Sequence, residues 1–195
     1  MDNTLLVLGL LKLQEMHGYH LGDLIDKRLS YLTDLKKPTL YHLLAKLEVA
    51  GDVAQSVSRE GNRPERRTYR LTARGAERFA DLLRRNLQDA PAAYFADDIG
   101  LLFLSELPAA EARACLDQKR AGIAQRMAAM QAALERHTPG TPAYFTLQHH
   151  VLHLRAESAW LDGLLEQLKK RAVREDILRC IAADEAPAPP RRAAR

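Results

Sequence analysis

The sequence predicts a mainly α-helical protein that contains one short β-hairpin. Apolar residues recur at the helical spacing i, i+3, i+4, i+7 through most of the 195 residues. The period changes to that of a strand only between Val53 and Leu71. A turn rich in Pro and Gly at residues 137–142 then separates two long helical segments, both of which carry a heptad pattern. Together these observations predict a small mixed domain followed by a helical hairpin.

Three helices are expected before the β-hairpin. The first covers residues 3–14, and the second covers residues 19–29 after a glycine break. The third begins at Pro38, because a residue without an N–H costs nothing in the first turn of a helix. It ends before Gly51, where a C-cap glycine belongs. The leucines of this helix share one face, which leaves an outward face of Tyr41, His42, Ala45 and Lys46.

The hairpin and a fourth helix complete the predicted N-terminal domain. An extended segment begins at Val53, residues 60–65 have the composition of a turn, and a second strand covers residues 66–71. Thr72 is a good N-cap for the fourth helix, which cannot continue through Pro91. We therefore assign residues 1–89 to one domain.

A helix followed by a basic hairpin is the pattern of a winged helix-turn-helix. The helix enters the major groove of DNA, and the hairpin lies along the backbone. The segment from Val53 to Arg78 contains seven arginines and three glutamates, so its net charge equals the +4 of the whole chain. Arginine makes planar, bidentate contacts that lysine cannot make. The alternative is a solvated basic hairpin without a role in nucleic-acid binding. The predicted DNA-binding residues are Lys36, Lys37, Thr39, Tyr41, His42, Lys46, Arg59, Arg63, Arg66 and Arg70.

Residues 90–183 are predicted to form a helical domain for dimerisation and effector binding. One long helix begins at Pro108, and another covers residues 143–181. Both follow alternating steps of four and three, which is a heptad seam. The two helices could close on each other within one chain, but surplus apolar residues such as Leu152 and Trp160 favour packing against a second copy. The residues predicted for the dimer interface are Leu147, Val151, Leu154, Leu161, Leu165 and Leu168. Residues 184–195 are rich in Pro, Ala and Arg and are predicted to be disordered.

An ordered set of short motifs spans about the first 90 residues. They are Leu8-Gly9-Leu10-Leu11, His17-Gly18-Tyr19, Thr39-Leu40-Tyr41, Leu43-Leu44, Leu47-Glu48, Gly51, Gly61, Arg63-Pro64 and Tyr69-Arg70-Leu71-Thr72-Ala73-Arg74-Gly75. In this order and spacing they resemble the PadR-like transcriptional regulators. The resemblance implies a homodimer whose last helix crosses the partner, and a regulator that usually represses. A two-fold dimer would present two reading helices to a pseudo-palindromic operator in double-stranded DNA.

Such a regulator needs a ligand that binds one arrangement of the dimer better than the other. The resemblance implies a small effector, since some family members respond to phenolic acids and others to flat, lipophilic drugs. Arg155 could pair with an anionic ligand. The candidate wall residues are Tyr94, Phe95, Phe103, His150, His153 and Trp160. Plain core packing is the alternative for each aromatic side chain. Our hypothesis is an aromatic carboxylate near His150, His153 and Trp160.

Two other sensing chemistries are less favoured by the residues. His149 and His153 could share a metal ion, with Glu157 as a third ligand, but a solvated or packed histidine cluster fits the ligand count better. We predict neither a metal nor a cofactor. Cys115 and Cys180 could sense the redox state, yet only scattered arginines would lower a thiol pKa. Free thiols are expected in a reducing cytoplasm.

An enzyme is not expected, because the sequence has no phosphate-cradling Gly-rich loop, no HExxH and no GxSxG. No apolar run is long enough to span a bilayer, and no basic stretch precedes the early apolar run, so we expect a cytoplasmic protein. The rival functional class is a protein-interaction module whose winged helix has only non-specific DNA affinity. That module predicts salt-sensitive, sequence-blind binding, whereas a repressor predicts a specific site that survives competitor DNA.

Overall fold

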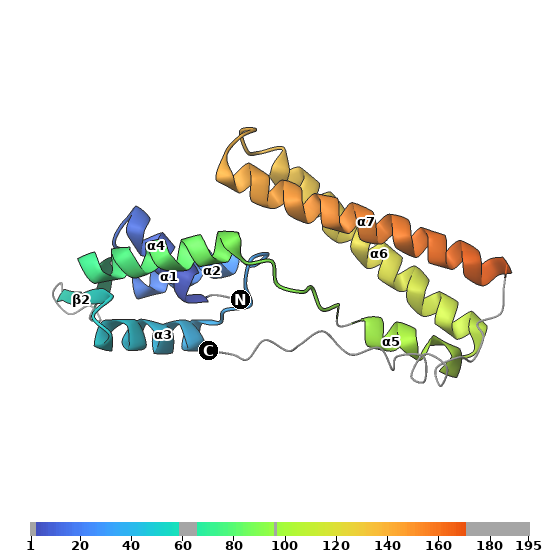
Figure 1. The fold of residues 1–195 in the computed structure, drawn as a ribbon, viewed down its shortest axis with the longest axis horizontal. Helices are drawn as coiled ribbons and strands as arrows, with labels where there is room; N and C mark the ends of the chain where they lie inside the picture. Colours follow the sequence, from blue (N-terminus) through green and yellow to red (C-terminus); the bar gives the residue numbers. More distant parts are fainter. Residues whose placement is uncertain (1–2, 59–65, 96, 171–195) are drawn as a thin grey trace. The chain divides into compact units, whose positions relative to one another are not determined.

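The computed structural model describes residues 3–58, 66–95 and 97–170 (Figure 1). The chain divides into two compact units, Met1–Ala92 and Ala93–Arg195, each of which is described here by itself. The expected fold class is confirmed: the described residues are mostly helical, with one small antiparallel sheet. The predicted tail at residues 184–195 lies outside the described residues, as do the tip of the hairpin and the predicted end of the last helix.

The N-terminal unit packs four helices around a leucine core. The core leucines of α1, α2 and α3 are almost fully buried, although Leu13 at the end of α1 is exposed, and Val53 and Tyr69 from the strands close the same core. Removing this much apolar surface from water is the main source of stability for a domain of this size. The elements are α1 (Asn3–Leu13), β1 (Met16–His17), α2 (Gly18–Arg28), α3 (Lys37–Val49), β2 (Val53–Ser58), β3 (Arg66–Leu71) and α4 (Ala73–Gln88).

The sheet has three strands in the order β1-β3-β2, so the predicted two-stranded hairpin was incomplete. β2 and β3 pair from Val53 opposite Leu71 to Ser58 opposite Arg66, and Met16 of β1 lies opposite Tyr69. Sequence periodicity missed β1 because two residues cannot show a period. Burial of Met16 holds this short strand against the free edge of β3.

The junction between α3 and α4 is tightly built around Asp52. The Asp52 carbonyl accepts hydrogen bonds from Thr72 N and Thr72 Oγ1, and Thr72 caps α4, as predicted, by accepting from Gly75 N at 3.0 Å. Gly51 has φ of +75°, which favours glycine. A Cβ at Gly75 would lie only 2.0 Å from Asp52 O. The sequence motif that ends in Gly75 therefore encodes a close approach of two backbone segments.

The C-terminal unit is a two-helix hairpin with two short helical turns before it. Its elements are α5 (Asp98–Leu102), the 3-10 helix η1 (Leu104–Glu106), α6 (Ala109–Leu134) and α7 (Pro142–Lys170). α6 and α7 lie side by side and antiparallel (Figure 1). Leu116 and Ile123 of α6 pack with Leu154, Leu161 and Leu165 of α7. Both helices therefore use their heptad seams within one chain.

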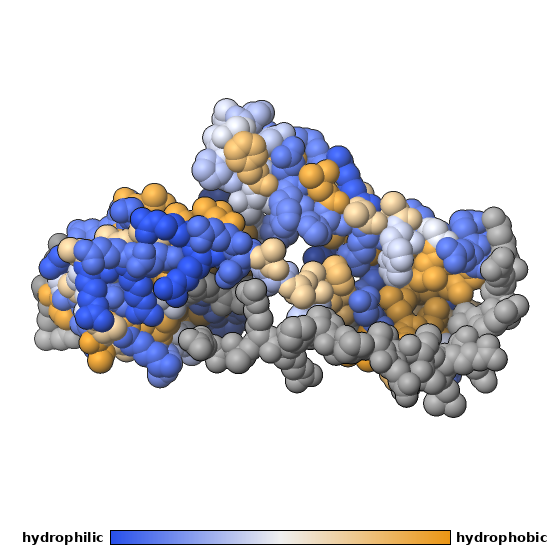
Figure 2. Space-filling view, in the orientation of Figure 1, coloured by the Kyte–Doolittle hydropathy of each residue, from blue (hydrophilic) through white to orange (hydrophobic). Residues whose placement is uncertain are grey.

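The six residues predicted for the dimer interface all lie on this seam side of α7. Five of them are buried within the chain, and Leu168 is partly buried against the same cluster. Other apolar side chains reach the surface of this unit (Figure 2). The large exposed apolar side chains of this unit include Ile99, Leu102, Phe103, Phe145, Leu152 and Trp160. Among the residues described by the structure, no helix is long and apolar enough to cross a bilayer.

Candidate DNA-binding surface and C-terminal pocket

The outward face of α3 is built as the sequence predicts. Leu40, Leu44 and Leu47 are buried in the core of the N-terminal unit. Because these three fix the rotation of the helix, the polar side chains between them must face solvent. The exposed set comprises the predicted residues Thr39, Tyr41, His42 and Lys46. This face offers hydrogen-bond donors, an aromatic ring and a positive charge on a single helix.

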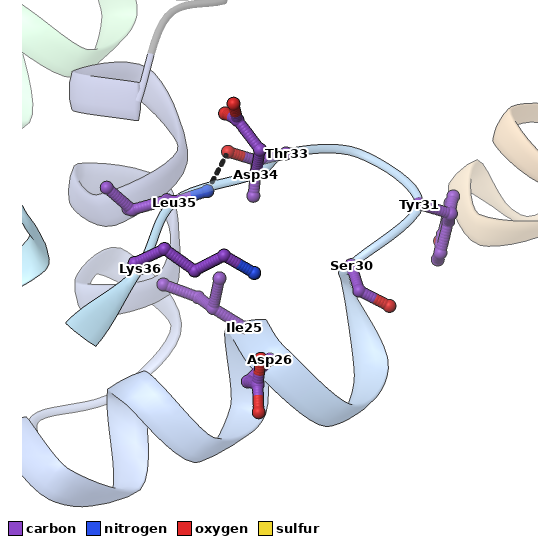
Figure 3. Close-up of a pocket in the computed structure, with 8 residues that line it drawn as sticks. All are labelled: Ile25, Asp26, Ser30, Tyr31, Thr33, Asp34, Leu35 and Lys36. Atoms are coloured by element: carbon purple, nitrogen blue, oxygen red, sulfur yellow. Dashed lines mark hydrogen bonds between the residues drawn. The ribbon is translucent and has the colours of Figure 1, made fainter.

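A small pocket of about 280 Å³ lies in the loop before α3 (Figure 3). Thr33 is buried there; its Oγ1 donates to Asn3 Oδ1 at 2.8 Å and accepts from Leu35 N at 3.1 Å. These bonds tie the loop to α1 and fix where α3 begins. Lys36, a predicted phosphate contact, lines this pocket together with Asp26 and Asp34.

Lys37, the other lysine predicted to contact phosphate, has partners within the chain. Its Nζ donates to Asp23 Oδ1 at 2.5 Å and lies 4.6 Å from the centre of the Tyr19 ring. Lys27 donates to the other oxygen of Asp23 at 2.9 Å. The hydrogen bonds from Lys37 and Lys27 lower the pKa of Asp23 to about 2. The Asp23 carboxylate therefore keeps its charge at every physiological pH.

The arginines of the hairpin and of the first turns of α4 fall into three groups. Arg70 is exposed on β3, and Arg66 begins the same strand. Arg78 is ion-paired with the fully buried carboxylate of Asp52, and Arg74 Nε lies 3.5 Å from Asp52 Oδ1. These two arginines hold α4 to the α3–β2 junction, so less of the basic charge is free for DNA than the sequence count indicates. The predicted contacts Arg59 and Arg63 lie outside the described residues.

A larger pocket, of about 620 Å³, lies within the C-terminal unit. It brings together four of the seven predicted effector residues, Phe95, His150, His153 and Trp160. Tyr94 instead lines a neighbouring hollow. Phe103 is not among the lining residues of either hollow. Arg155 donates from Nη2 to Gln131 Oε1 at 3.2 Å and does not line the pocket.

Lys119 is at the centre of the charged groups in this pocket. Its Nζ pairs with Asp97 and, at 3.1 Å, with Glu157 Oε1, and it lies 5.3 Å from the centre of the Trp160 ring. Burial acts to lower the pKa of Lys119, but the hydrogen bonds to the two carboxylates outweigh it and raise the pKa. The same bond from Lys119 lowers the pKa of Asp97. Burial lowers the pKa of His150, which favours its neutral form.

The comparisons with known proteins agree with this geometry. Residues 7–81 match the model of the family described as "Transcriptional regulator PadR-like family". Residues 7–81, which make up most of the N-terminal unit, are therefore similar to PadR-like transcriptional regulators. No curated protein matches the chain.

Solved PadR-like structures share the fold over most of the chain. Bacillus subtilis PadR in complex with operator DNA has a TM-score of 0.74 at 20% identity, covering 85% of this chain and 98% of that chain. The same PadR in complex with p-coumaric acid has a TM-score of 0.70 at 21% identity, covering 85% and 94%. The PadR-like regulator BC1756 from Bacillus cereus has a TM-score of 0.65 at 18% identity, covering 86% and 98%. PadR-like proteins are transcriptional regulators and not enzymes.

Five charged residues that line the C-terminal pocket were not among the effector residues predicted from the sequence. They are Asp97, Asp98, Lys119, Arg126 and Glu157. A signal was present: Lys119 and Arg126 are seven residues apart on α6, and Glu157 precedes Trp160 by three on α7, so each pair shares a helix face. The predicted set contained only aromatic residues, histidines and one arginine, so the other charged residues of the pocket were left out.

The histidines of α7 form a pair but not a closed metal site. His149 Nε2 and His153 Nε2 lie 3.0 Å apart, and both side chains are exposed. Among the described residues, no group of three His, Cys, Asp or Glu is placed to hold a metal ion. Cys115 is exposed, and Cys180 lies outside the part of the chain that the structure describes.

Proposed function

We propose that this PadR-like protein is a dimeric, sequence-specific repressor that a small aromatic acid releases from its operator. The observation that carries the proposal is the exposed polar face of α3, fixed in orientation by the buried Leu40, Leu44 and Leu47. Tyr41, His42 and Lys46 read or flank the major groove, and Arg70 lies on the adjacent hairpin. B. subtilis PadR has been solved with operator DNA, which supports this assignment.

The dimer follows from what a single unit cannot provide. One winged helix contacts only a few base pairs, whereas two copies linked by their C-terminal hairpins gain a second, effectively intramolecular contact. The exposed Phe145, Leu152 and Trp160 of α7 supply apolar surface for the second copy. Exposed apolar side chains on a helical hairpin can be covered by another protein surface.

The effector proposal rests on which cation in the pocket is free to pair with an anion. Lys119 is already neutralised by Asp97 and Glu157. Arg126 lines the same pocket and has no ion-pair partner among the described residues. An aromatic carboxylate would therefore pair with Arg126, which replaces Arg155 in this role, and place its ring near Trp160. The complex of B. subtilis PadR with p-coumaric acid supports this ligand class.

A gel-shift assay tests the DNA part of the proposal. The probe is the duplex immediately upstream of the protein's own gene, with excess unrelated duplex as competitor. A specific repressor gives a discrete complex that survives the competitor. Smeared binding that disappears with modest salt would instead favour a protein-interaction module with non-specific DNA affinity.

The single tryptophan tests the effector part. p-Coumaric acid should quench Trp160 fluorescence, and its amide, which lacks the negative charge, should bind at least about tenfold more weakly. Arg126→Gln should remove this preference for the acid. Arg155→Gln is the matched control and should keep it, because Arg155 does not line the pocket. Equal binding of the acid and the amide by the unmodified protein would contradict the carboxylate assignment.

A further inference from the structure

Two lysines share one carboxylate beside the start of α3. Lys37 Nζ lies 2.5 Å from Asp23 Oδ1, and Lys27 Nζ lies 2.9 Å from Asp23 Oδ2. The side chain of Asp23 is only 18% exposed, whereas those of Lys37 and Lys27 are 42% and 68% exposed. The negative charge is thus mostly covered and the two positive charges face solvent. This small patch presents two fixed cations to any incoming anion.

Further contacts restrict Lys37 before any ligand arrives. Its aliphatic part lies against Gly22, where an added Cβ would come within 3.3 Å of Lys37 Cγ. Its ammonium group lies over the Tyr19 ring at cation–π distance. A free lysine side chain loses considerable rotamer entropy when it is fixed on a ligand. Here much of that entropy has already been lost on folding.

The position of the patch also favours an anion. The first turn of α3 contains no acidic residue, and the N-cap Lys36 makes no side-chain capping bond. The positive end of a helix dipole disfavours lysines at this place unless negative charge is nearby. Asp23 supplies one negative charge against two lysines, so the site remains cationic. A phosphate group bound beside the N-terminus of α3 would balance this remaining positive charge.

We propose that Asp23 is a positioning residue for DNA binding, which holds Lys27 and Lys37 as a clamp on one phosphate of the DNA backbone. Tyr19, Asp23 and Lys27 follow one another at intervals of four along α2 and therefore share a stripe of that helix. Lys37 lies one turn before Tyr41 on α3, so the clamp continues the exposed face of the reading helix. The inference rests on the proposed DNA-binding function and adds Lys27 to its contacts.

The simpler alternative is that Asp23 only compensates for the local excess of positive charge. The two alternatives predict opposite signs for Asp23→Asn. This substitution keeps the size of the side chain and makes the protein more positive. Charge compensation alone predicts tighter DNA binding and an unchanged or steeper salt dependence. The clamp predicts binding about three- to tenfold weaker, because both lysines must then be ordered on binding.

Fluorescence anisotropy with a labelled 30-base-pair duplex of arbitrary sequence is a suitable test, since phosphate contacts do not depend on sequence. Affinity is measured across a range of salt concentrations. With Asp23→Asn, the slope of log affinity against log salt should fall by about one, because one phosphate contact is lost. Asp26→Asn is the matched control: it lies on the same helix, makes the same charge change and has no ion-pair partner among the described residues. It should leave the slope unchanged.

A second variant separates the clamp from a folding defect. Lys27→Gln changes an exposed side chain and should also reduce the slope by about one, with no loss of thermal stability beyond that of Asp26→Asn. Combining Lys27→Gln with Asp23→Asn should weaken binding by less than the sum of the two single effects. Tighter binding by Asp23→Asn, or unchanged slopes in both variants, would overturn the clamp. If the unmodified protein bound no duplex at all, the proposed DNA-binding function would fail together with it.

Discussion

The two units of this chain differ in how many elements build their cores. The N-terminal unit closes one core with side chains from three helices and three strands. The C-terminal unit buries one seam between α6 and α7 and leaves Phe145, Leu152 and Trp160 about half exposed. The N-terminal unit also exposes large apolar side chains, among them Leu13, Val49 and Leu87, but its core draws on many elements, whereas the core of the second unit depends on a single pair of helices. This difference indicates which substitutions act on folding and which act on assembly.

The comparison predicts opposite effects for the same substitution in the two units. Gly75→Ala should destabilise the N-terminal unit by about 3 kcal/mol or more, because its Cβ would collide with Asp52 O. Gly163→Ala on α7 should stabilise the C-terminal unit by about 0.5 to 1 kcal/mol, because nothing lies within 4 Å of its added Cβ. Thermal unfolding followed by circular dichroism measures both. Destabilisation by Gly163→Ala would show that a partner packs against that face.

Two leucines of α7 separate folding from assembly. Leu161 is fully buried, and Leu161→Ala should cost about 2 to 3 kcal/mol at any protein concentration. Leu152 is about half exposed, so Leu152→Ser should leave the fold intact and weaken dimerisation by about tenfold. Sedimentation over a range of protein concentrations, with unfolding measured in parallel, distinguishes the two effects. An unchanged monomer–dimer equilibrium in Leu152→Ser would remove this residue from the interface.

The Asp52 junction gives a smaller effect within the N-terminal unit. Asp52→Asn removes the buried carboxylate that holds Arg78 and should destabilise the N-terminal unit by about 2 kcal/mol. Urea unfolding measures this loss. The exposed ion pair between Arg84 and Asp81 on the same helix is the control, and Asp81→Asn should change stability by less than about 0.5 kcal/mol. Equal effects would mean that burial of Asp52 contributes nothing.

The smallest expected effect concerns pH and the Asp23 ion pairs. The pKa of Asp23 is about 2 in the folded protein and 3.8 without its partners, so the folded state prefers the charged form. The resulting stability is present above about pH 3.8 and is lost as the pH falls toward 2. Asp23→Asn should therefore melt below the unmodified protein at pH 6, and the gap should close in acid. A gap that stays constant from pH 6 to pH 2 would contradict this assignment.

The sequence was most informative where a residue type determines the backbone conformation of its immediate neighbours. Pro38, Gly51 and Thr72 marked the helix ends correctly, because caps and glycine conformations are set within a few residues. The leucine spacing of α3 likewise predicted its exposed face. In the C-terminal half, spacing predicted two helices and a seam, but it could not say whether the seam closes within one chain or between two. The six residues assigned to a dimer lie in the seam of a single chain.

The fold class, the exposed face of α3 and the resemblance to PadR-like regulators were thus determined by the sequence alone, since periodicity and capping act over short distances. The tertiary structure alone decided which charges remain available. It pairs Arg74 and Arg78 with Asp52, Lys37 with Asp23, and Lys119 with Asp97 and Glu157. Such pairs join residues far apart in the chain, and electrostatic energy depends on distance and burial rather than on sequence position. A count of charges cannot contain that information.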